Sequence, residues 1–309
     1  MSLAIVFPGQ GSQSVGMLKA FYDEYDIAKV TFAQAADVLG YDLWKIISSG
    51  ETNELNRTEV TQPAMLTAGY ICWKIWQQNN GAVPAYMAGH SLGEYTALVC
   101  AGALSFEDAL GLVADRGKLM QAAVPEGEGA MAAILGLDDE RVIAACKDAE
   151  QGEVVEAVNF NSPGQVVIAG QRTAVQRAID LLKETGAKRA LMLPVSVPSH
   201  CQLMLEAANL LGEKLDAVNF SEPGIPVLHN VDVCTHINAD EIRLVLKKQL
   251  YNPVRWVETI QSMSSLGVDT MVECGPGKVL VGLCKRIDKN INGLPVFDPD
   301  SLATALAVN

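Results

Sequence analysis

A serine framed by two glycines is the feature of the sequence best suited to chemistry. The segment 89–93 reads Gly-His-Ser-Leu-Gly, between the apolar run 85–88 and the helix-like run 94–99. This G-x-S-x-G pattern is typical of a nucleophile elbow, a sharp strand-to-helix turn whose glycines avoid side-chain clashes. We therefore expect Ser91 to be a nucleophile at the start of a helix, where negative charge is stabilised.

A serine hydroxyl becomes an effective nucleophile only when a neighbouring base takes its proton. Four histidines could be this base: His90, His200, His229 and His236. His90 adjoins the serine on the expected turn and should point away from it. His229 closes a buried strand and should be a hydrogen-bonded core residue, whereas His236 lies in a polar loop and should be solvated. Elimination favours His200, and the alternative is a loop histidine with no role.

The remaining polar groups of such a site are harder to assign. No aspartate or glutamate between Ser91 and His200 stands out as a partner for the imidazole, so a backbone carbonyl is the open alternative. The backbone N–H of Leu92 follows the nucleophile and is the expected first donor of an oxyanion hole. The glycine-rich loop 9–11 is suited to supply the second donor, because glycines let the backbone approach a ligand.

Arg116 stands out because it shares the apolar face of an expected helix. Helical spacing places it with four apolar residues, Leu112, Val113, Leu119 and Met120. A buried arginine is costly unless its charge is paired. Two alternatives remain open: a structural salt bridge to an acid, or a guanidinium fork that binds a substrate carboxylate.

The composition narrows the class of protein. The chain has 309 residues, of which 49% are hydrophobic, and a net charge of -13. It can form one large or two smaller domains, and its acidity disfavours nucleic-acid binding. The 7 cysteines include no C-x-x-C pair and are expected to be reduced thiols in a cytoplasmic protein. No apolar run is long enough to cross a membrane, and no metal-binding motif occurs, so neither a membrane nor a metal is expected.

Apolar periodicity predicts the elements that position these residues. Strands are expected at 3–7, 85–89, 226–230 and 269–273. Helices are expected at about 17–39, 62–79, 106–123, 202–216, 239–250, 254–265 and 278–289, the last being the final element. Strands that alternate with helices predict an α/β fold with a parallel sheet covered on both faces.

The segment 128–197 follows a different order. Strands are expected at 130–137, 153–160, 165–169 and 188–195, with helices at 138–150 and from a capping box at 173–176 to 185. This β-α-β-β-α-β order is the ferredoxin-like arrangement. We therefore predict that 128–197 is a small domain inserted into a larger one formed by 1–127 and 198–309.

Six motifs occur together in one order along the chain. They are Phe-Pro-Gly-Gln-Gly-Ser-Gln at 7–13, Gln-Pro-Ala at 62–64, Gly-His-Ser-Leu-Gly-Glu-Tyr at 89–95, Asn-Phe-Asn-Ser-Pro-Gly-Gln at 159–165, Pro-Val-Ser-Val-Pro-Ser-His at 194–200 and Glu-Cys-Gly-Pro-Gly-Lys-Val-Leu at 273–280. In them, and over nearly its whole length, the chain resembles the malonyl-CoA:acyl-carrier-protein transacylases of bacterial type II fatty-acid synthesis. The resemblance implies an α/β-hydrolase-like core with a ferredoxin-like insertion.

The resemblance also implies roles for individual residues. The nucleophile falls on Ser91, the base on His200, the oxyanion donors on the backbone of Gln10 and Leu92, the carboxylate-binding arginine on Arg116, and the carbonyl that orients the base on Gln249. The partners are malonyl-CoA and acyl carrier protein, with no cofactor, and a monomer is expected. The carrier of this pathway is acidic, so a basic docking patch is expected. Candidates are Lys285, Arg286 and Lys289 first, and Lys188 and Arg189 second, against the alternative of a solvated helix face.

Three other functions fit parts of the sequence. The same elbow would serve a serine esterase or thioesterase that uses water as acceptor. A polyketide-pathway acyltransferase would use the same chemistry with another carrier. A non-catalytic acyl-binding module is disfavoured because both Ser91 and His200 are present.

Overall fold

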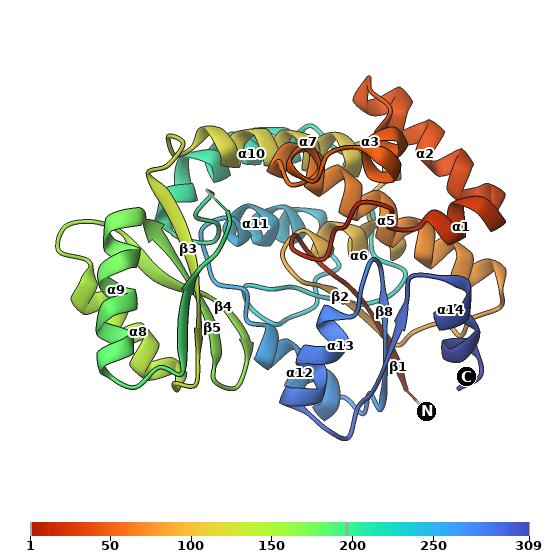
Figure 1. Ribbon diagram of the computed structural model, residues 1–309. Coiled ribbons are helices and arrows are strands. Elements are labelled where there is room, and N and C mark those ends of the chain that lie inside the picture. Colours follow the sequence, from red (N-terminus) through yellow and green to blue (C-terminus); the bar gives the residue numbers. More distant parts are fainter. Residues whose placement is uncertain (1, 196, 309) are drawn as a thin grey trace.

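Two separate sheets organise the molecule (Figure 1). The computed structural model describes residues 2–195 and 197–308, so Ser196 of the 194–200 motif lies outside the described residues. One sheet is parallel, with strand order β7-β2-β1-β8-β9, and the other is antiparallel, with order β4-β5-β3-β6. The predicted α/β class with a parallel sheet is confirmed.

The strands of the parallel sheet are short and mostly apolar. They are β1 (Leu3–Phe7), β2 (Tyr86–Gly89), β7 (Val227–Leu228), β8 (Thr270–Cys274) and β9 (Asn292–Val296). Strand β9 was not predicted, and the expectation that the chain's elements end with the helix at 278–289 is wrong. The β9 sequence Asn-Gly-Leu-Pro-Val carries a glycine and a proline, which weaken a strand pattern and are tolerated at a sheet edge.

Twelve described helices accompany this sheet. They are α1 (Lys19–Glu24), α2 (Asp26–Leu39), α3 (Leu43–Ser49), α4 (Thr52–Leu55), α5 (Thr58–Gln78), α6 (Gly93–Cys100), α7 (Phe106–Ala122), α10 (Leu205–Asp216), α11 (Ala239–Gln249), α12 (Trp256–Ser265), α13 (Val279–Ile287) and α14 (Pro299–Leu306). The single helix expected at 17–39 is two helices, because the backbone of Tyr25 is extended. The short helices α3 and α4 and the last helix α14 were not predicted.

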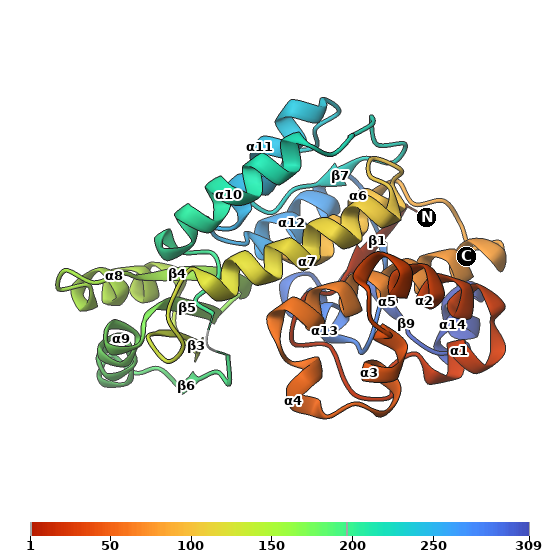
Figure 2. The same cartoon turned by 90° about the horizontal axis from the view of Figure 1, so that it is seen from above.

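Both faces of the parallel sheet are covered. Along β1, Ile5 and Phe7 belong to the apolar cluster that α5, α6 and α7 complete, whereas Ala4 and Val6 belong to the cluster of α12 and α13. This alternation follows from the two-residue period of a strand. Helices α5, α7 and α10 lie side by side over one face (Figure 2).

The antiparallel sheet and its two helices come from one continuous segment. Its elements are β3 (Gly129–Leu135), α8 (Asp139–Ala149), β4 (Val155–Ser162), β5 (Gln165–Gln171), α9 (Arg172–Glu184) and β6 (Arg189–Met192), in the predicted order. The expected capping box at 173–176 is wrong: the N-cap of α9 is Gln171 and not Thr173, and the Thr173 hydroxyl donates to Glu153 Oε1 at 2.6 Å instead. Strand β4 bonds to the rest of the molecule at Val254, whose N–H donates to the carbonyl of Val158 at 2.8 Å.

Candidate active site

Ser91 occupies a strained turn between β2 and α6. Its φ of 53° lies in the left-handed region, which is uncommon for a residue with a side chain. A Cβ added at Gly89 would come within 1.8 Å of the carbonyl carbon of Gly93, and one added at Gly93 within 2.1 Å of the Phe7 carbonyl oxygen. Both glycines are therefore required by close backbone contact, as the elbow pattern predicts.

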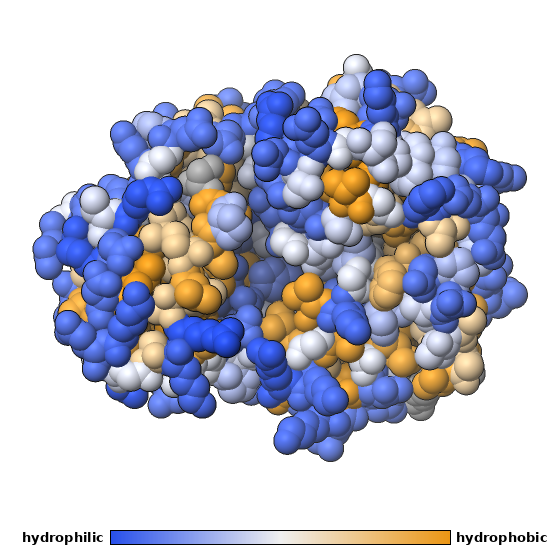
Figure 3. Space-filling view, viewed as in Figure 1, coloured by the Kyte–Doolittle hydropathy of each residue, from blue (hydrophilic) through white to orange (hydrophobic). Residues whose placement is uncertain are grey.

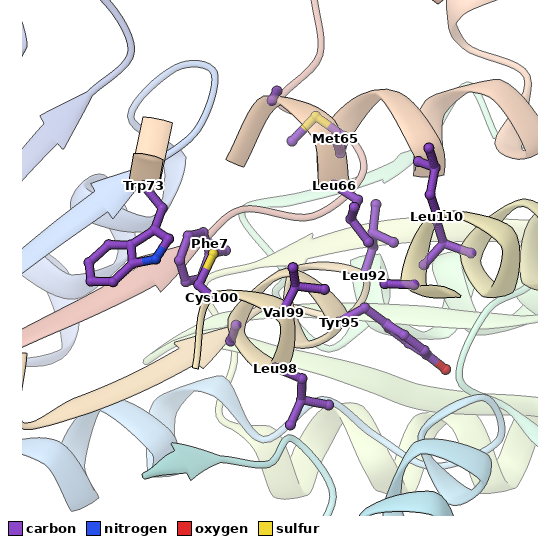
Figure 4. Packing of buried hydrophobic residues seen from close by; sticks show 14 of the residues in the cluster. Phe7, Met65, Leu66, Trp73, Leu92, Tyr95, Leu98, Val99, Cys100 and Leu110 are labelled. Atoms are coloured by element: carbon purple, nitrogen blue, oxygen red, sulfur yellow. The ribbon is translucent and has the colours of Figure 1, made fainter. Parts of the chain in front are cut away.

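Helix α6 directly follows the turn that carries Ser91 and is buried along its whole length. Figure 4 shows Leu92, Tyr95 and Leu98 of this part of the chain among residues of neighbouring elements, including Leu66 of α5 and Leu110 of α7. A turn that is joined to a helix packed on all sides has little freedom to relax. Ser91 is therefore held by a rigid support.

His200 contacts Ser91 directly. Its Nε2 lies 2.8 Å from Ser91 Oγ, and its Nδ1 lies 2.7 Å from the backbone carbonyl oxygen of Gln249. The carbonyl can only accept, so the hydrogen of the neutral ring is assigned to Nδ1, and Nε2 is left to accept the serine proton. Burial, and then the positive charge of Arg116, lower the pKa of His200 to about 3. The imidazole is therefore neutral and ready to act as a base.

Arg116 lies beside this pair, fully buried on α7. Its Nη1 donates to Gln62 Oε1 at 2.8 Å, its Nη2 donates to Gln249 Oε1 at 3.0 Å, and Nη2 lies 3.4 Å from Ser91 Oγ. Its Nε has no hydrogen-bond partner. Burial lowers the pKa of the guanidinium. No carboxylate of residues 2–195 and 197–308 forms an ion pair with Arg116, so the salt-bridge alternative finds no support.

The backbone donors expected for an oxyanion hole lie at the same place. Gln10 and Leu92 line the cleft with Ser91, and within the described part of the chain their backbone N–H groups donate no hydrogen bond. The N–H of Ser91 itself is occupied, because it donates to Asn230 Oδ1 at 2.7 Å. Two donors thus remain for a negatively charged oxygen.

A cleft of about 490 Å³ opens above these groups. Its polar side carries Ser91, His200 and Arg116, and its apolar side includes Met131 and Val167 from the antiparallel sheet. The surface is hollowed between the part that carries β3–β6 and the rest of the molecule (Figure 3). Among the described residues, no group of histidine, cysteine and acidic side chains could hold a metal ion. A cleft of this size accommodates an acyl thioester.

The other histidines have separate partners. His90 Nε2 lies 2.8 Å from Asn161 Oδ1, so this ring points away from the Ser91 hydroxyl, as expected. His229 is buried with Nδ1 at 2.7 Å from Glu94 Oε1, as expected for a core histidine. The expectation that His236 is solvated is wrong, because its two ring nitrogens bond to Asp232 and Glu241.

The basic residues suggested for docking lie outside the cleft. Lys285 and Arg286 are exposed in the last turn of α13, and Arg286 Nη1 donates to Gln165 Oε1 of β5 at 2.7 Å. Lys188, Arg189 and Lys289 are also exposed. All seven cysteines are free, and no helix in the described ranges is long and apolar enough to span a membrane.

Two residues of this site did not follow from the chemistry of the sequence. Gln62 holds Arg116, and Asn230 holds the backbone of Ser91. The Gln-Pro-Ala motif at 62–64 was a signal for the first, although it assigned no role. Nothing local marks Asn230, because its contacts join residues far apart in the sequence.

Comparisons with known proteins agree with this geometry. The model of the family described as "Acyl transferase domain" matches residues 4–295. The malonyl CoA-acyl carrier protein transacylase of Escherichia coli strain K12 is 55% identical over 303 residues, with 98% of each chain covered. That of Haemophilus influenzae is 57% identical over 296 residues, covering 96% of this chain and 95% of the relative.

Solved structures give the same answer. An acyl carrier protein S-malonyltransferase from Vibrio cholerae superposes with a TM-score of 0.97 at 56% identity, with both chains fully covered (100%). A malonyl-transacylase in complex with its type II PKS acyl-carrier protein gives a TM-score of 0.99 at 54% identity, again with 100% of each chain covered. The chain therefore belongs to the acyl transferase domain family and, within it, to the malonyl CoA-acyl carrier protein transacylases.

Proposed function

We propose that this acyltransferase moves a malonyl group from malonyl-CoA to the phosphopantetheine thiol of acyl carrier protein through an ester on Ser91. The observation that carries the proposal is a single constellation. Ser91 Oγ lies 2.8 Å from a neutral imidazole and 3.4 Å from a buried guanidinium with a free Nε. A nucleophile, a base and an unpaired cation at these distances suit an acyl group that ends in a carboxylate.

The first half-reaction acylates the serine. The guanidinium of Arg116 binds the malonyl carboxylate, while His200 Nε2 takes the proton of Ser91 and the serine oxygen attacks the thioester carbonyl. The backbone N–H groups of Gln10 and Leu92 stabilise the oxyanion, each by about 2.7–4 kcal/mol in comparable enzymes. As the carbon–sulfur bond breaks, the proton on His200 passes to the sulfur and CoA leaves as a thiol.

The second half-reaction runs the same steps with another thiol. His200 takes the proton of the phosphopantetheine thiol, and the sulfur attacks the malonyl ester on Ser91. The serine oxygen leaves and recovers the proton from His200. CoA departs before the carrier enters, so we expect ping-pong kinetics. The carbonyl of Gln249 supports the ring in both directions, because it stabilises the protonated imidazole that forms in each half.

Several features of the whole chain belong to the same proposal. The segments 1–127 and 198–309 form an α/β-hydrolase-like catalytic domain into which a ferredoxin-like domain, 128–197, is inserted. The enzyme acts as a cytoplasmic monomer without a cofactor. The exposed Lys285 and Arg286 dock the acidic carrier. The similar malonyl-transacylase in complex with a type II PKS carrier supports a polyketide carrier as the second candidate acceptor.

Product analysis tests the proposal. Purified protein is given malonyl-CoA with and without phosphopantetheinylated carrier protein of each pathway, and malonyl-carrier and free malonate are both measured. Rapid malonyl-carrier formation with little free malonate supports transfer, and the preferred carrier identifies the pathway. Release of free malonate at the same rate without any carrier would make the enzyme a thioesterase.

The site assignment has its own test. A Ser91→Ala variant should form no malonyl-enzyme, because the only group proposed to carry the acyl chain is removed. The measurement is the intact mass of the protein after brief exposure to malonyl-CoA. A malonyl adduct on the variant would show that another residue is the nucleophile.

A further inference from the structure

We propose that Asn230 is a positioning residue that holds Ser91 in its strained conformation. The inference rests on the proposed role of Ser91. Asn230 follows β7, next to the end of β2 in the parallel sheet, and its side chain is fully buried. Asn230 does not itself line the cleft, so its effect on a substrate must pass through Ser91, to which it is bonded.

The Asn230 side chain bonds to the backbone on both sides of the turn. Its Oδ1 accepts from the N–H of Ser91 at 2.7 Å, and its Nδ2 donates to the carbonyl oxygen of Gly89 at 2.7 Å. The two backbone partners determine the orientation of the Asn230 side-chain amide. An N–H only donates, so it faces Oδ1, and a carbonyl only accepts, so it faces Nδ2. One side chain thus spans the peptide groups around His90.

These two bonds act on a backbone conformation that is unfavourable by itself. Ser91 has φ 53°, and a residue with a side chain keeps this left-handed conformation only when the surrounding structure imposes it. If the bonds were lost, the turn could relax and Ser91 Oγ would move from its position 2.8 Å from His200 Nε2.

A buried carboxylate fixes Asn230 in turn. The backbone N–H of Asn230 donates to Glu94 Oε2 at 2.9 Å, and the same oxygen accepts from Gln249 Nε2 at 2.8 Å. The carbonyl of Gln249 orients His200. Glu94 therefore connects the support of the nucleophile to the support of the base, so that the two shift together rather than separately.

The experiment compares Asn230→Ala with Asn238→Ala in the full-length protein. Asn238 is exposed and caps the start of α11 through the N–H of Asp240, at the end of this helix opposite Gln249, so its loss lowers stability at a distance from the site. Single-turnover labelling of Ser91 with malonyl-CoA gives the acylation rate and the apparent Kd, and thermal unfolding gives Tm. We expect Asn230→Ala to slow acylation on the order of 10²-fold, the effect of misplacing a reacting group by about 1 Å.

Other readouts separate positioning from a general loss of structure. The apparent Kd should stay within about twofold, because Arg116 is untouched, and transfer to the carrier thiol should slow by the same factor as acylation. Acylation within about twofold of the parent, a change in Kd alone, or a loss that Asn238→Ala reproduces at equal Tm would each overturn the inference. Should Asn230→Ala not fold, Asn230→Asp keeps the size and the acceptor but not the bond to Gly89, and it should also slow acylation at unchanged Kd. If the parent itself is not labelled at Ser91, the proposed function fails instead.

Discussion

At the scale of single residues, the charge of the buried Arg116 influences the protonation of the buried His200. Arg116 forms no ion pair among the described residues, and its positive charge adds to burial in keeping His200 neutral. Gln249 touches both, with its side chain on Arg116 and its carbonyl on His200. A carboxylate that binds Arg116 would offset this charge and raise the basicity of the imidazole. Under the proposed mechanism, binding of the acyl group by Arg116 and activation of Ser91 are thus linked.

Replacing Arg116 should therefore slow the transfer of an acyl group that carries a carboxylate more than the transfer of an uncharged acyl group. We expect Arg116→Ala to weaken malonyl transfer by on the order of 1.5–3 kcal/mol, the value of a charge-assisted hydrogen bond, and acetyl transfer by much less. The measurement is kcat/KM for malonyl-CoA and acetyl-CoA. Arg141→Ala, an exposed substitution on α8, should change neither. Equal losses for the two substrates would reject the carboxylate fork.

The low pKa of His200 should appear as a pH dependence of stability. The folded pKa, about 3, lies below the ordinary value of 6.5, so at intermediate pH the unfolded chain binds a proton that the folded chain does not. Stability is therefore complete above the ordinary value and falls as the pH drops. From about pH 7.5 to about pH 5 the contribution of this group should fall by about 2 kcal/mol.

Urea unfolding at both pH values measures this contribution. The parent should lose more stability on acidification than His200→Gln, whose side chain does not titrate. The buried His90, whose pKa burial also lowers, is present in both proteins and cancels in the comparison. Equal losses would mean that His200 is not held neutral by the fold.

At the scale of the element, the elbow depends on close approach between α6 and β1. Gly93→Ala would place a Cβ 2.1 Å from the Phe7 carbonyl oxygen, so we expect a loss of about 1–3 kcal/mol in unfolding free energy and most of the activity. Gly111→Ala is the matched control, since its Cβ on α7 meets nothing within 4 Å. It should stabilise the protein by about 0.5–1 kcal/mol. A Gly93→Ala enzyme as stable and active as the parent would contradict the packing argument.

Elements with strong periodicity were predictable, and those set by distant contacts were not. The apolar run Leu3–Phe7 predicts a strand, and the apolar spacing along α7 predicts a helix. Both elements were therefore predicted correctly, the second with Arg116 on its apolar face. Strand β9 lacks such a signal and forms because β8 offers it an edge. The carbonyl of Gln249 came from resemblance alone, and Asn230 was missed, because a backbone oxygen or a lone amide has no pattern of its own.

At the scale of the molecule, the negative net charge of the chain repels the proposed partner, an acidic carrier protein. The chain has a net charge of -13, so an acidic carrier must meet local basic residues to dock. We expect Lys285→Glu to raise KM for the carrier several-fold while the acylation rate with malonyl-CoA stays the same. Lys183→Glu, an exposed change of equal charge on α9, should leave KM unaltered. If both variants raise KM equally, the effect is that of net charge and the docking patch lies elsewhere.

The two sides of the cleft contribute different kinds of residue. All the proposed reacting groups stand on the parallel-sheet side, whereas Met131 and Val167 of the antiparallel sheet supply apolar surface opposite them. Mutations on that second wall can reshape the space for the acyl chain and leave the reaction machinery as it is. Substitutions on the antiparallel-sheet side of the cleft can thus change the range of acyl groups, by evolution or by engineering.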